Sequence, residues 1–494
     1  MIQTGDLVTA LVGLEIHVEL DTATKMFCRC LNRFGDPPNT HTCPVCIGMP
    51  GVLPVMNRRA VELAMKVGLA LDCEAPAFTK WDRKGYYYPD LPKNYQISQY
   101  DLPLSIHGHL DVPLGDGQTK RVRILRAHLE EDAGKNIHEH PAHTAVDLNR
   151  AGVPLLEIVS QPDMNSVEEV AAYARAMQRL VRWLGASQAN MQMGHMRFEP
   201  NINLHIRRGQ QLFKTPIVEV KNLNSFRALE TAVAFEIERQ YEQWLEDNDY
   251  ILEKLGKQNR GFDDQRGVTV FQREKEEAHD YRYFPDPDLA PVVVDDTWRD
   301  SVRASIGELP LARRRRYMQA YNLSFKEADA LTQDAPTGNL LDEAVKLGAD
   351  AKRCTNILLG KVAAVANERG CSIAEVGVTA AQLAELAKMV ELGEITAGAS
   401  TRIVARAIEV GGDPRVLAEQ EGLLAVTDST ALERWVDQAI TANPQAVAEV
   451  LSGGKKQKKA FGFLMGQVMK LSGGAAAPAQ VQELFARKLG PLAR

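Results

Sequence analysis

Residues 13–20 read Gly13-Leu14-Glu15-Ile16-His17-Val18-Glu19-Leu20, and this stretch decides the expected fold. Apolar and polar side chains alternate along it with the period of two that is typical of a half-buried strand. Glu15, His17 and Glu19 are therefore expected on one face of the strand, with the apolar side chains on the other. Similar strand-like segments follow at residues 121–125, 153–159 and 217–221.

Helices are expected between these strands and through the rest of the chain. Ser166 and Glu169 form a capping box ahead of a helix over 170–184, and a second helix is expected over 228–246. Helix and strand do not alternate regularly, which favours an α+β fold with mostly antiparallel pairing. From about residue 295 onward the pattern is helical. Later capping boxes are expected at Ser324 with Glu327 and at Thr379 with Gln382.

The composition is that of an ordinary globular protein with more than one domain: 494 residues, 45% hydrophobic and 25% charged. No apolar run approaches the roughly 18 residues that span a bilayer, and no secretory or transit pattern is evident, so the cytoplasm is the expected compartment. The net charge of -6 neither indicates nor excludes nucleic-acid binding. Two basic clusters, taken alone, are interpreted as ordinary solvated surface. They are Arg313 to Arg316, and Lys455, Lys456, Lys458 and Lys459.

Four cysteines, Cys28, Cys30, Cys43 and Cys46, form a C-x-C pair and a C-x2-C pair separated by twelve residues in a loop-rich stretch. Zn2+ favours four thiolates in a tetrahedron, and a loop with little core of its own gains order from the metal. Disulfides and an iron-sulfur cluster are the alternatives, and a reducing compartment disfavours the first. Four thiolates leave no open coordination position, so we expect a structural zinc site.

Acidic residues occur where apolar ones would be expected. Glu157 interrupts the apolar strand at 153–159, and the run Glu130-Glu131-Asp132 is tightly anionic. If these segments pair near the strand that carries His17, one imidazole and several carboxylates would converge on a cation such as Mg2+. On spacing alone a simpler alternative is favoured, in which Glu157 pairs with Arg150 and His17 is a surface histidine.

Two further segments combine groups that suit a phosphate-containing ligand. Residues 80–90, Lys80-Trp81-Asp82-Arg83-Lys84-Gly85-Tyr86-Tyr87-Tyr88-Pro89-Asp90, mix basic and aromatic side chains that could hold phosphate and stack a base, or could equally fill a core edge. Residues 219–225 lead from a strand into a helix start, where Lys221 could meet an anion, although a capped helix entry is the commoner outcome. No P-loop, dinucleotide fingerprint or G-x-S-x-G elbow occurs in the sequence.

Together these segments belong to a longer series of blocks: Gly13-Leu14-Glu15-Ile16-His17-Val18, Pro50-Gly51-Val52-Leu53-Pro54, Asp82 to Asp90, His128-Leu129-Glu130-Glu131-Asp132-Ala133-Gly134-Lys135, Val146-Asp147-Leu148-Asn149-Arg150, Lys221-Asn222-Leu223-Asn224-Ser225-Phe226, Asp280-Tyr281-Arg282-Tyr283-Phe284-Pro285 and Gly462-Phe463-Leu464-Met465-Gly466-Gln467. In this order they resemble the B subunits of the aspartyl/glutamyl-tRNA amidotransferases, and the resemblance runs through the whole chain.

The resemblance implies three domains: a mostly antiparallel cradle at 1–295 that holds ATP, magnesium and zinc, a helical connecting domain at 296–345, and a helical YqeY-like tail at 346–494 that binds tRNA. It implies a catalytic Mg2+ on His17, Glu131 and Glu157, with Glu15 close by, and a structural Zn2+ on the four cysteines. The implied enzyme is a ligase in which ATP phosphorylates the side-chain carboxylate of Glu-tRNA(Gln) or Asp-tRNA(Asn), and ammonia displaces the phosphate.

Further roles rest on the same resemblance. Arg83, Lys84, Tyr86 and Lys221 would contact ATP or the substrate, and Lys455, Lys456, Lys458 and Lys459 would contact tRNA. Ammonia would come from an amidase, the A subunit, held with a small C subunit in a heterotrimer, and a non-discriminating synthetase is a further expected partner. Two stretches depart from the forms associated with many members of the family, so the roles of their residues are left open. They are 196–201 and 472–478.

Two other classes of protein remain as alternatives. In the first, the chain is a tRNA-binding adaptor whose acidic residues only stabilise the fold. In the second it is a free-standing metallohydrolase, which would be active without partners or tRNA.

Overall fold

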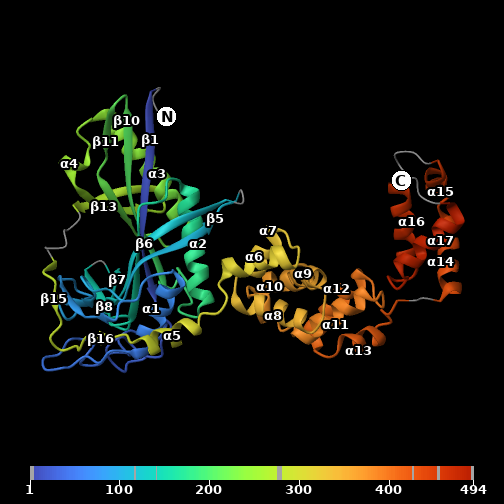
Figure 1. Cartoon of the computed structure of the whole chain (residues 1–494), viewed down its shortest axis with the longest axis horizontal. Coiled ribbons are helices and arrows are strands. Elements are labelled where there is room, and N and C mark those ends of the chain that lie inside the picture. The colour runs from blue at the N-terminus through green and yellow to red at the C-terminus, as the bar shows by residue number, and fades with distance from the viewer. Residues whose placement is uncertain are drawn as a thin grey trace. The chain divides into compact units, whose positions relative to one another are not determined.

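The computed structural model describes residues 5–115, 118–140, 142–274, 281–425, 428–452 and 457–490. The chain divides into two compact units, one ending at Leu309 and the other beginning at Pro310. The first unit combines sheets with helices and the second is helical, so the predicted α+β class is confirmed (Figure 1).

A large sheet organises the first unit. Its strand order is β14-β13-β12-β10-β1-β9-β6-β5, with β11 paired to β10, and every pairing is antiparallel except that of β12 with β13. The strands are β1 (Asp6–Glu19), β5 (Ser105–Pro113), β6 (Thr119–Glu131), β9 (Pro154–Ser160), β10 (Met196–Arg208), β11 (Gln211–Lys214), β12 (Ile217–Lys221), β13 (Lys257–Asp263) and β14 (Val268–Glu274). The mostly antiparallel pairing that the sequence predicted is therefore present.

The alternation of residues 13–20 sets the two faces of β1. Leu14, Ile16 and Val18 are buried in the main hydrophobic core, as the period of two requires. The helices α1 (Arg58–Ala70), α2 (Val167–Trp183) and α3 (Phe226–Glu246) supply the rest of that core. Figure 1 shows α2 and α3 running alongside the long strands. The polar residues of β1 consequently lie on the face of the sheet that these helices do not cover.

Three smaller sheets complete the first unit. They are β15-β3-β4 (Phe284–Pro285, Asp82–Gly85 and Tyr95–Ser98), β16-β2 (Val292–Val293 and Phe78–Thr79) and the hairpin β7-β8 (Lys135–His140 and His143–Asp147). Strand β4 packs against β6, so the segment at 80–90 lies close to the polar face of the large sheet. Two short helices, α4 (Leu252–Leu255) and α5 (Asp296–Ala304), also belong here, and Val302 of α5 joins the main core.

The second unit contains two hydrophobic clusters, one formed by residues 317–423 and one by residues 432–485. Its helices are α6 (Pro310–Ala320), α7 (Phe325–Leu331), α8 (Ala335–Lys346), α9 (Ala351–Ile357), the π-helix η2 (Leu358–Val362), α10 (Ala363–Arg369), the 3-10 helix η3 (Ala374–Val376), α11 (Ala380–Glu391), α12 (Ala397–Val410), α13 (Pro414–Gln420), α14 (Ser429–Ala442), α15 (Pro444–Leu451), α16 (Gln457–Leu471) and α17 (Pro478–Leu489). The capping boxes predicted at Ser324 and Thr379 are confirmed. No helix of the described residues has the length and apolar character of a membrane span.

Candidate active site and metal centre

The polar face of the large sheet brings His17, Glu130 and Glu157 together. In the register of the sheet, His17 of β1 stands opposite Glu157 of β9. The His17 Nε2 atom lies 3.6 Å from Glu130 Oε1 and 3.6 Å from Glu157 Oε2. The three ligand atoms lie within 4.8 Å of one another, and both carboxylates are buried. One imidazole with two carboxylates is a donor set that suits Mg2+ or Mn2+, so these side chains fit a divalent cation.

The expected ligand Glu131 is placed differently. Its Oε1 atom accepts the Ile97 N–H at 3.0 Å and forms an ion pair with Lys93, while its Oε2 atom lies beside Gly152 near the cysteine loop. The geometry thus assembles Glu130, not Glu131, with His17 and Glu157. Adjacent residues of a strand point to opposite faces, so the Glu130 and Glu131 side chains lie on opposite sides of the sheet.

The simpler alternative from the sequence, in which Glu157 pairs with Arg150, is not what the structure contains. Arg150 donates to the carbonyl oxygens of Ala133 and Gly134 and lies 3.5 Å from Asp132, which also accepts a hydrogen bond from Arg197 at 2.9 Å. The polar partners of Glu157 are imidazoles, and only 14% of the His17 side chain is exposed. A surface histidine would be far more open than this.

His128 is a component of the site that the sequence predictions did not include. It stands opposite Glu157 on the other side of β9, in strand β6, and it is buried. Its Nε2 atom lies 3.4 Å from Glu157 Oε2 and 3.9 Å from Glu130 Oε2. The alternation His128-Leu129-Glu130 was the available signal, because it places the imidazole and the Glu130 carboxylate on one face of a strand.

The charges of this cluster are strongly coupled. Burial alone would lower the pKa of His17, but the carboxylates of Glu157, Glu199 and Glu130 outweigh it and raise the pKa to about 9. Burial would raise the pKa of Glu157, but the imidazoles of His128 and His17 hold it well below its usual range. Without a metal ion, His17 is therefore protonated at neutral pH. Its imidazolium then supplies the positive charge beside the two carboxylates that a bound cation would otherwise supply.

A second acidic group lies beside the first, formed by Glu15, Glu199 and Glu219. Glu15 accepts a hydrogen bond from the Asn201 amide at 3.0 Å. Lys221 lies between the other two, with its Nζ atom 2.6 Å from Glu199 Oε2 and 2.5 Å from Glu219 Oε1. The expected anion-binding group Lys221 is thus already paired with carboxylates, and it partly neutralises this second group.

Lys84 of β3 faces the acidic cluster, and Tyr86, just after this strand, donates a hydrogen bond to Gln96 Oε1 at 3.3 Å. The Lys84 Nζ atom lies 4.8 Å from the centre of the Tyr281 ring and 5.7 Å from that of Tyr86. Burial would lower the pKa of Lys84, but Glu130 and Glu157 outweigh it, so the ammonium group is attracted to the cluster. Arg83 points away from it, because its Nε atom donates to Asp286 at 2.7 Å and its Nη2 atom to Asp288 at 2.8 Å.

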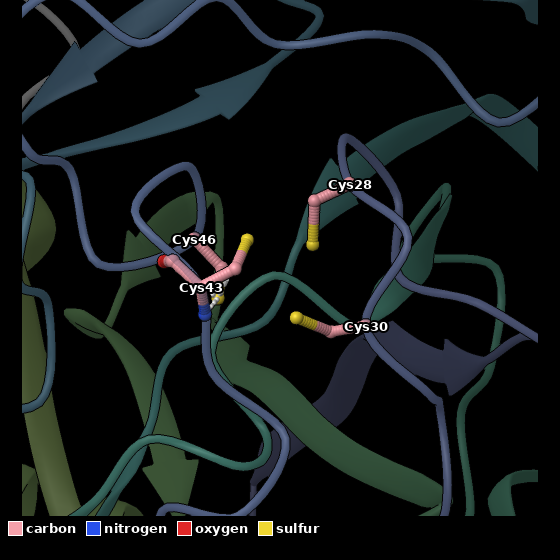
Figure 2. Close-up of side chains that lie close together, drawn as sticks. All are labelled: Cys28, Cys30, Cys43 and Cys46. Carbon is pink, nitrogen blue, oxygen red and sulfur yellow. Dashed lines mark hydrogen bonds between the residues drawn. The ribbon is translucent and has the colours of Figure 1, made fainter.

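The four predicted cysteine ligands converge. Figure 2 shows Cys28 and Cys30 on one loop and Cys43 and Cys46 on another, with the sulfur atoms of the two pairs turned toward a common centre. All four are free thiols whose sulfur atoms lie within 4.8 Å of one another, and the sulfur atoms of Cys43 and Cys46 are 3.9 Å apart. A tetrahedral zinc site with bonds of about 2.3 Å requires sulfur atoms about 3.8 Å apart. The cluster therefore fits a tetrahedral metal ion.

Lys25 adds a buried positive charge to this cluster. Its side chain is fully buried, and its Nζ atom lies 3.7 Å from Cys46 Sγ and 3.1 Å from the Leu148 carbonyl oxygen. The Cys28 thiol outweighs the opposing effect of burial and, with Lys25 and the Cys43 backbone, lowers the pKa of Cys46 to about 4. A buried ammonium group needs a negative partner, and a tetrathiolate metal site carries net negative charge.

Hydrogen bonds connect the loop between the two cysteine pairs to the segment at 146–149. The backbone N–H of Asn39 donates to Asp147 Oδ1 at 3.0 Å, and the backbone N–H of Leu148 donates to Asn39 Oδ1 at 2.8 Å. The backbone N–H of His41 donates to Asn149 Oδ1 at 2.8 Å. This segment runs directly into Arg150, which contacts Asp132. The cysteine loops and the acidic face are therefore linked through one short stretch of chain.

The two basic clusters differ in their surroundings. Arg314 is buried and its Nη1 atom donates to Asp329 at 2.7 Å, while Arg316 donates to Asp342 at 2.8 Å. Arg313, Arg314 and Arg316 are thus engaged in ion pairs inside the helical unit, whereas Arg315 is exposed. Lys458 and Lys459 are exposed at the start of α16, whereas Lys455 and Lys456 lie outside the described residues.

Comparison with known proteins places this fold and this site in one class. Residues 10–300 match the family described as the GatB/GatE catalytic domain, and residues 339–489 match the GatB domain. The first match spans the sheet that carries the acidic face and the cysteine loops, and the second lies in the helical unit. The chain thus combines a catalytic domain of the GatB/GatE type with a GatB helical region.

Named relatives identify the family more closely. The chain is 43% identical to the B subunit of the aspartyl/glutamyl-tRNA(Asn/Gln) amidotransferase of Carboxydothermus hydrogenoformans, over 98% of this chain and 99% of the relative. It is 44% identical to the proteins of the same name from Nitratidesulfovibrio vulgaris and Geobacter sulfurreducens, over 97% of this chain and 99% of each relative. The chain belongs to the family of aspartyl/glutamyl-tRNA(Asn/Gln) amidotransferase B subunits, which confirms the predicted family and its ligase class.

Proposed function

We propose that this chain is the ATP-using subunit of a glutamine-dependent tRNA amidotransferase. It activates the side-chain carboxylate of Glu-tRNA(Gln), of Asp-tRNA(Asn) or of both, and the product is Gln-tRNA(Gln) or Asn-tRNA(Asn). The observation that carries the proposal is the buried group of His17, Glu130 and Glu157 on the polar face of the sheet in a GatB/GatE catalytic domain.

The chemistry explains why such a site is needed. A carboxylate is a poor electrophile, so its oxygen first attacks the γ-phosphorus of ATP, which forms an acyl phosphate and releases ADP. Ammonia then attacks the acyl carbon, inorganic phosphate leaves with the electron pair of the C–O bond, and the excess proton passes to solvent. The first step brings the negative charges of the ATP phosphates and of the substrate carboxylate close together, and these charges must be neutralised.

Different residues of the polar face are proposed to have different roles in this first step. His17, Glu130 and Glu157 would hold a Mg2+ ion, which supplies positive charge against the phosphate oxygens. Lys84 faces the same cluster and is the cationic side chain best placed to meet a phosphate or the substrate carboxylate. Glu15 is two residues from His17 on the same face. Because Arg83 and Lys221 each contact two carboxylates, we assign them to support of the site.

The remaining cofactor and partners follow from the family. The four cysteines would hold a structural Zn2+. The ammonia would come from an amidase, the A subunit, held with a small C subunit, and a non-discriminating synthetase would supply the misacylated tRNA. The exposed Lys458 and Lys459 of α16 are proposed to contact tRNA, together with Lys455 and Lys456.

The test uses the assembled complex and the substitution Glu157→Gln. Ammonium chloride replaces glutamine, so that the amidase is bypassed, and amidated tRNA is measured at saturating Mg2+ and ATP. We expect Glu157→Gln to lose at least about a hundredfold in rate, because a ligand to the cation is removed. Glu238→Gln, on the exposed side of α3, is the matched control and should leave the rate unchanged.

The two alternatives give different results. A tRNA-binding adaptor would show full amidation with Glu157→Gln, and that outcome would overturn the catalytic assignment. A free-standing hydrolase would release products with the isolated chain, in the absence of tRNA and of the other subunits. We expect no such activity.

A further inference from the structure

We propose that His128 is a positioning residue of the cation site. Its imidazole holds the Glu157 and Glu130 carboxylates in place from the side opposite His17, and so strengthens cation binding without being a ligand. This inference rests on the cation site of the proposed function.

The strand order places Glu157 between two imidazoles. Strand β9 lies between β1 and β6, and Glu157 stands opposite His17 on one side and opposite His128 on the other. The Glu157 Oε2 atom is therefore flanked by two imidazoles, at 3.6 Å from His17 Nε2 and 3.4 Å from His128 Nε2. Glu130 Oε2, on the same strand as His128, lies 3.9 Å from that imidazole.

The two histidines are not equivalent. The three donor atoms that lie within 4.8 Å of one another belong to His17, Glu130 and Glu157, and His128 is outside this group. His128 is also the more buried of the two, with 4% of its side chain exposed against 14% for His17. A cation at the centre of the group would thus contact His17, while His128 contacts Glu157 Oε2 and Glu130 Oε2 from strand β6.

The polar contacts of His128 come from one ring nitrogen. Among the described residues, the buried Nδ1 atom of His128 has no hydrogen-bond partner, so its described polar contacts are those of Nε2 with the two carboxylates. Two carboxylates this close repel each other, and a donor near an oxygen of each offsets part of that repulsion. Partners that orient metal ligands in this way typically contribute about 10- to 100-fold to metal affinity.

The geometry suggests three substitutions that separate the two ring nitrogens. A glutamine amide can place its N–H group near the position of Nε2, an asparagine amide can place it near that of Nδ1, and leucine supplies neither. Only His128→Gln retains the contact that the proposal requires. The probe is Mn2+, which accepts the same donors as Mg2+ and whose binding is measured directly by electron paramagnetic resonance of the assembled complex, without turnover.

We expect His128→Leu and His128→Asn to weaken Mn2+ binding by about 10- to 100-fold, and His128→Gln to remain within about threefold of the unsubstituted complex. At saturating Mg2+ the amidation rate of all three variants should stay within about threefold of that of the unsubstituted complex. Weaker binding should instead raise the Mg2+ concentration that gives half of the maximal rate. His205→Leu, at a half-buried position of β10 away from the cluster, is the control and should leave Mn2+ affinity unaltered.

Three results would overturn the inference. Unchanged Mn2+ affinity in His128→Leu would show that the imidazole does not support the site. Equal losses in the folded Gln and Leu variants would show that Nε2 is not the group involved. A collapse of the rate at saturating Mg2+ would make His128 a ligand or a catalytic residue. If His128→Leu does not fold, the contrast between Gln and Asn decides. Absence of Mn2+ binding in the unsubstituted complex would instead refute the proposed cation site itself.

Discussion

At the scale of single residues, the site depends on which of two adjacent glutamates of β6 faces His17 and Glu157. Glu130 lies with His17 and Glu157, whereas Glu131 forms a buried ion pair with Lys93. We therefore propose different roles for two carboxylates that are neighbours in sequence, with Glu130 binding a cation and Glu131 stabilising the fold.

Substitution of the two glutamates should separate these roles. We expect Glu130→Gln to weaken Mn2+ binding at least about tenfold with little change in melting temperature. Glu131→Gln should retain Mn2+ affinity but destabilise the fold by about 3–5 kcal/mol, because it leaves the Lys93 ammonium buried without its counter-charge. Metal titration and thermal unfolding of both variants check this. The reverse pattern would make Glu131 the ligand.

The protonation of His17 predicts a pH dependence of cation binding. A metal ion requires the neutral imidazole, while the pKa of the metal-free His17 is raised to about 9. Below pH 9 the metal must displace a proton from His17. The affinity for the metal should therefore fall about tenfold for each unit that pH decreases below 9, and it should level off above pH 9. Titrations with Mn2+ at several pH values measure the slope. A flat profile between pH 7 and 9 would contradict this account.

At the scale of elements, the period of two at residues 13–20 was enough to predict a strand with Glu15 and His17 on one face. Strand β12 has the predicted bounds of 217–221, and the first two predicted helices lie within about three residues of α2 and α3. These elements were accessible because their signals are local: alternation, caps and turn residues.

The arrangement of side chains within the site was less accessible. The pairing of β6 with β9 contains a register shift between Ile124 and Arg126, so counting residues along β6 does not reveal which glutamate meets Glu157. His128 was missed because its alternation with Glu130 shows only a shared face, while its contact with Glu157 depends on the pairing of β6 with β9. The carboxylate partners of Arg83 lie some two hundred residues further on, at Asp286 and Asp288, and no spacing argument reaches that far.

The cysteine loops are the element for which a single substitution is most informative. Cys43→Ser should remove the metal and lower the melting temperature, since loops with little core of their own take their order from the ion. Cys371→Ser, which alters a half-buried free thiol in the helical unit, is the control. Zinc content by elemental analysis and thermal unfolding are the measurements. Retained zinc with an unchanged melting temperature would exclude Cys43 as a ligand.

At the scale of the whole molecule, the chain joins a unit proposed to carry the catalytic site to a helical unit proposed to bind tRNA. The arginines at 313–316 are largely engaged in ion pairs within the helical unit, which leaves the lysines of α16 as the better candidates for phosphate contacts. Each lysine that neutralises a phosphate releases about one counterion, so its contribution depends on salt concentration.

Charge reversal in α16 tests this assignment. The double substitution Lys458→Glu and Lys459→Glu should weaken tRNA binding by the assembled complex, and should reduce the slope of log affinity against log salt by about one for each lost contact. Lys326→Glu, an exposed position of α7, is the control. Binding isotherms at several salt concentrations give the slope. Identical affinity and slope would remove α16 from the tRNA surface.

The location of the bound cation tests the account most directly. Crystals of the assembled complex soaked in Mn2+ should show an anomalous scattering peak within about 2.0–2.3 Å of donor atoms from His17, Glu130 and Glu157, with the remaining positions open to water and phosphate. His128 should lie outside the coordination sphere. A peak on Glu131, or no peak at this face at saturating Mn2+, would contradict the assignment of the polar face as the cation-binding part of the catalytic site.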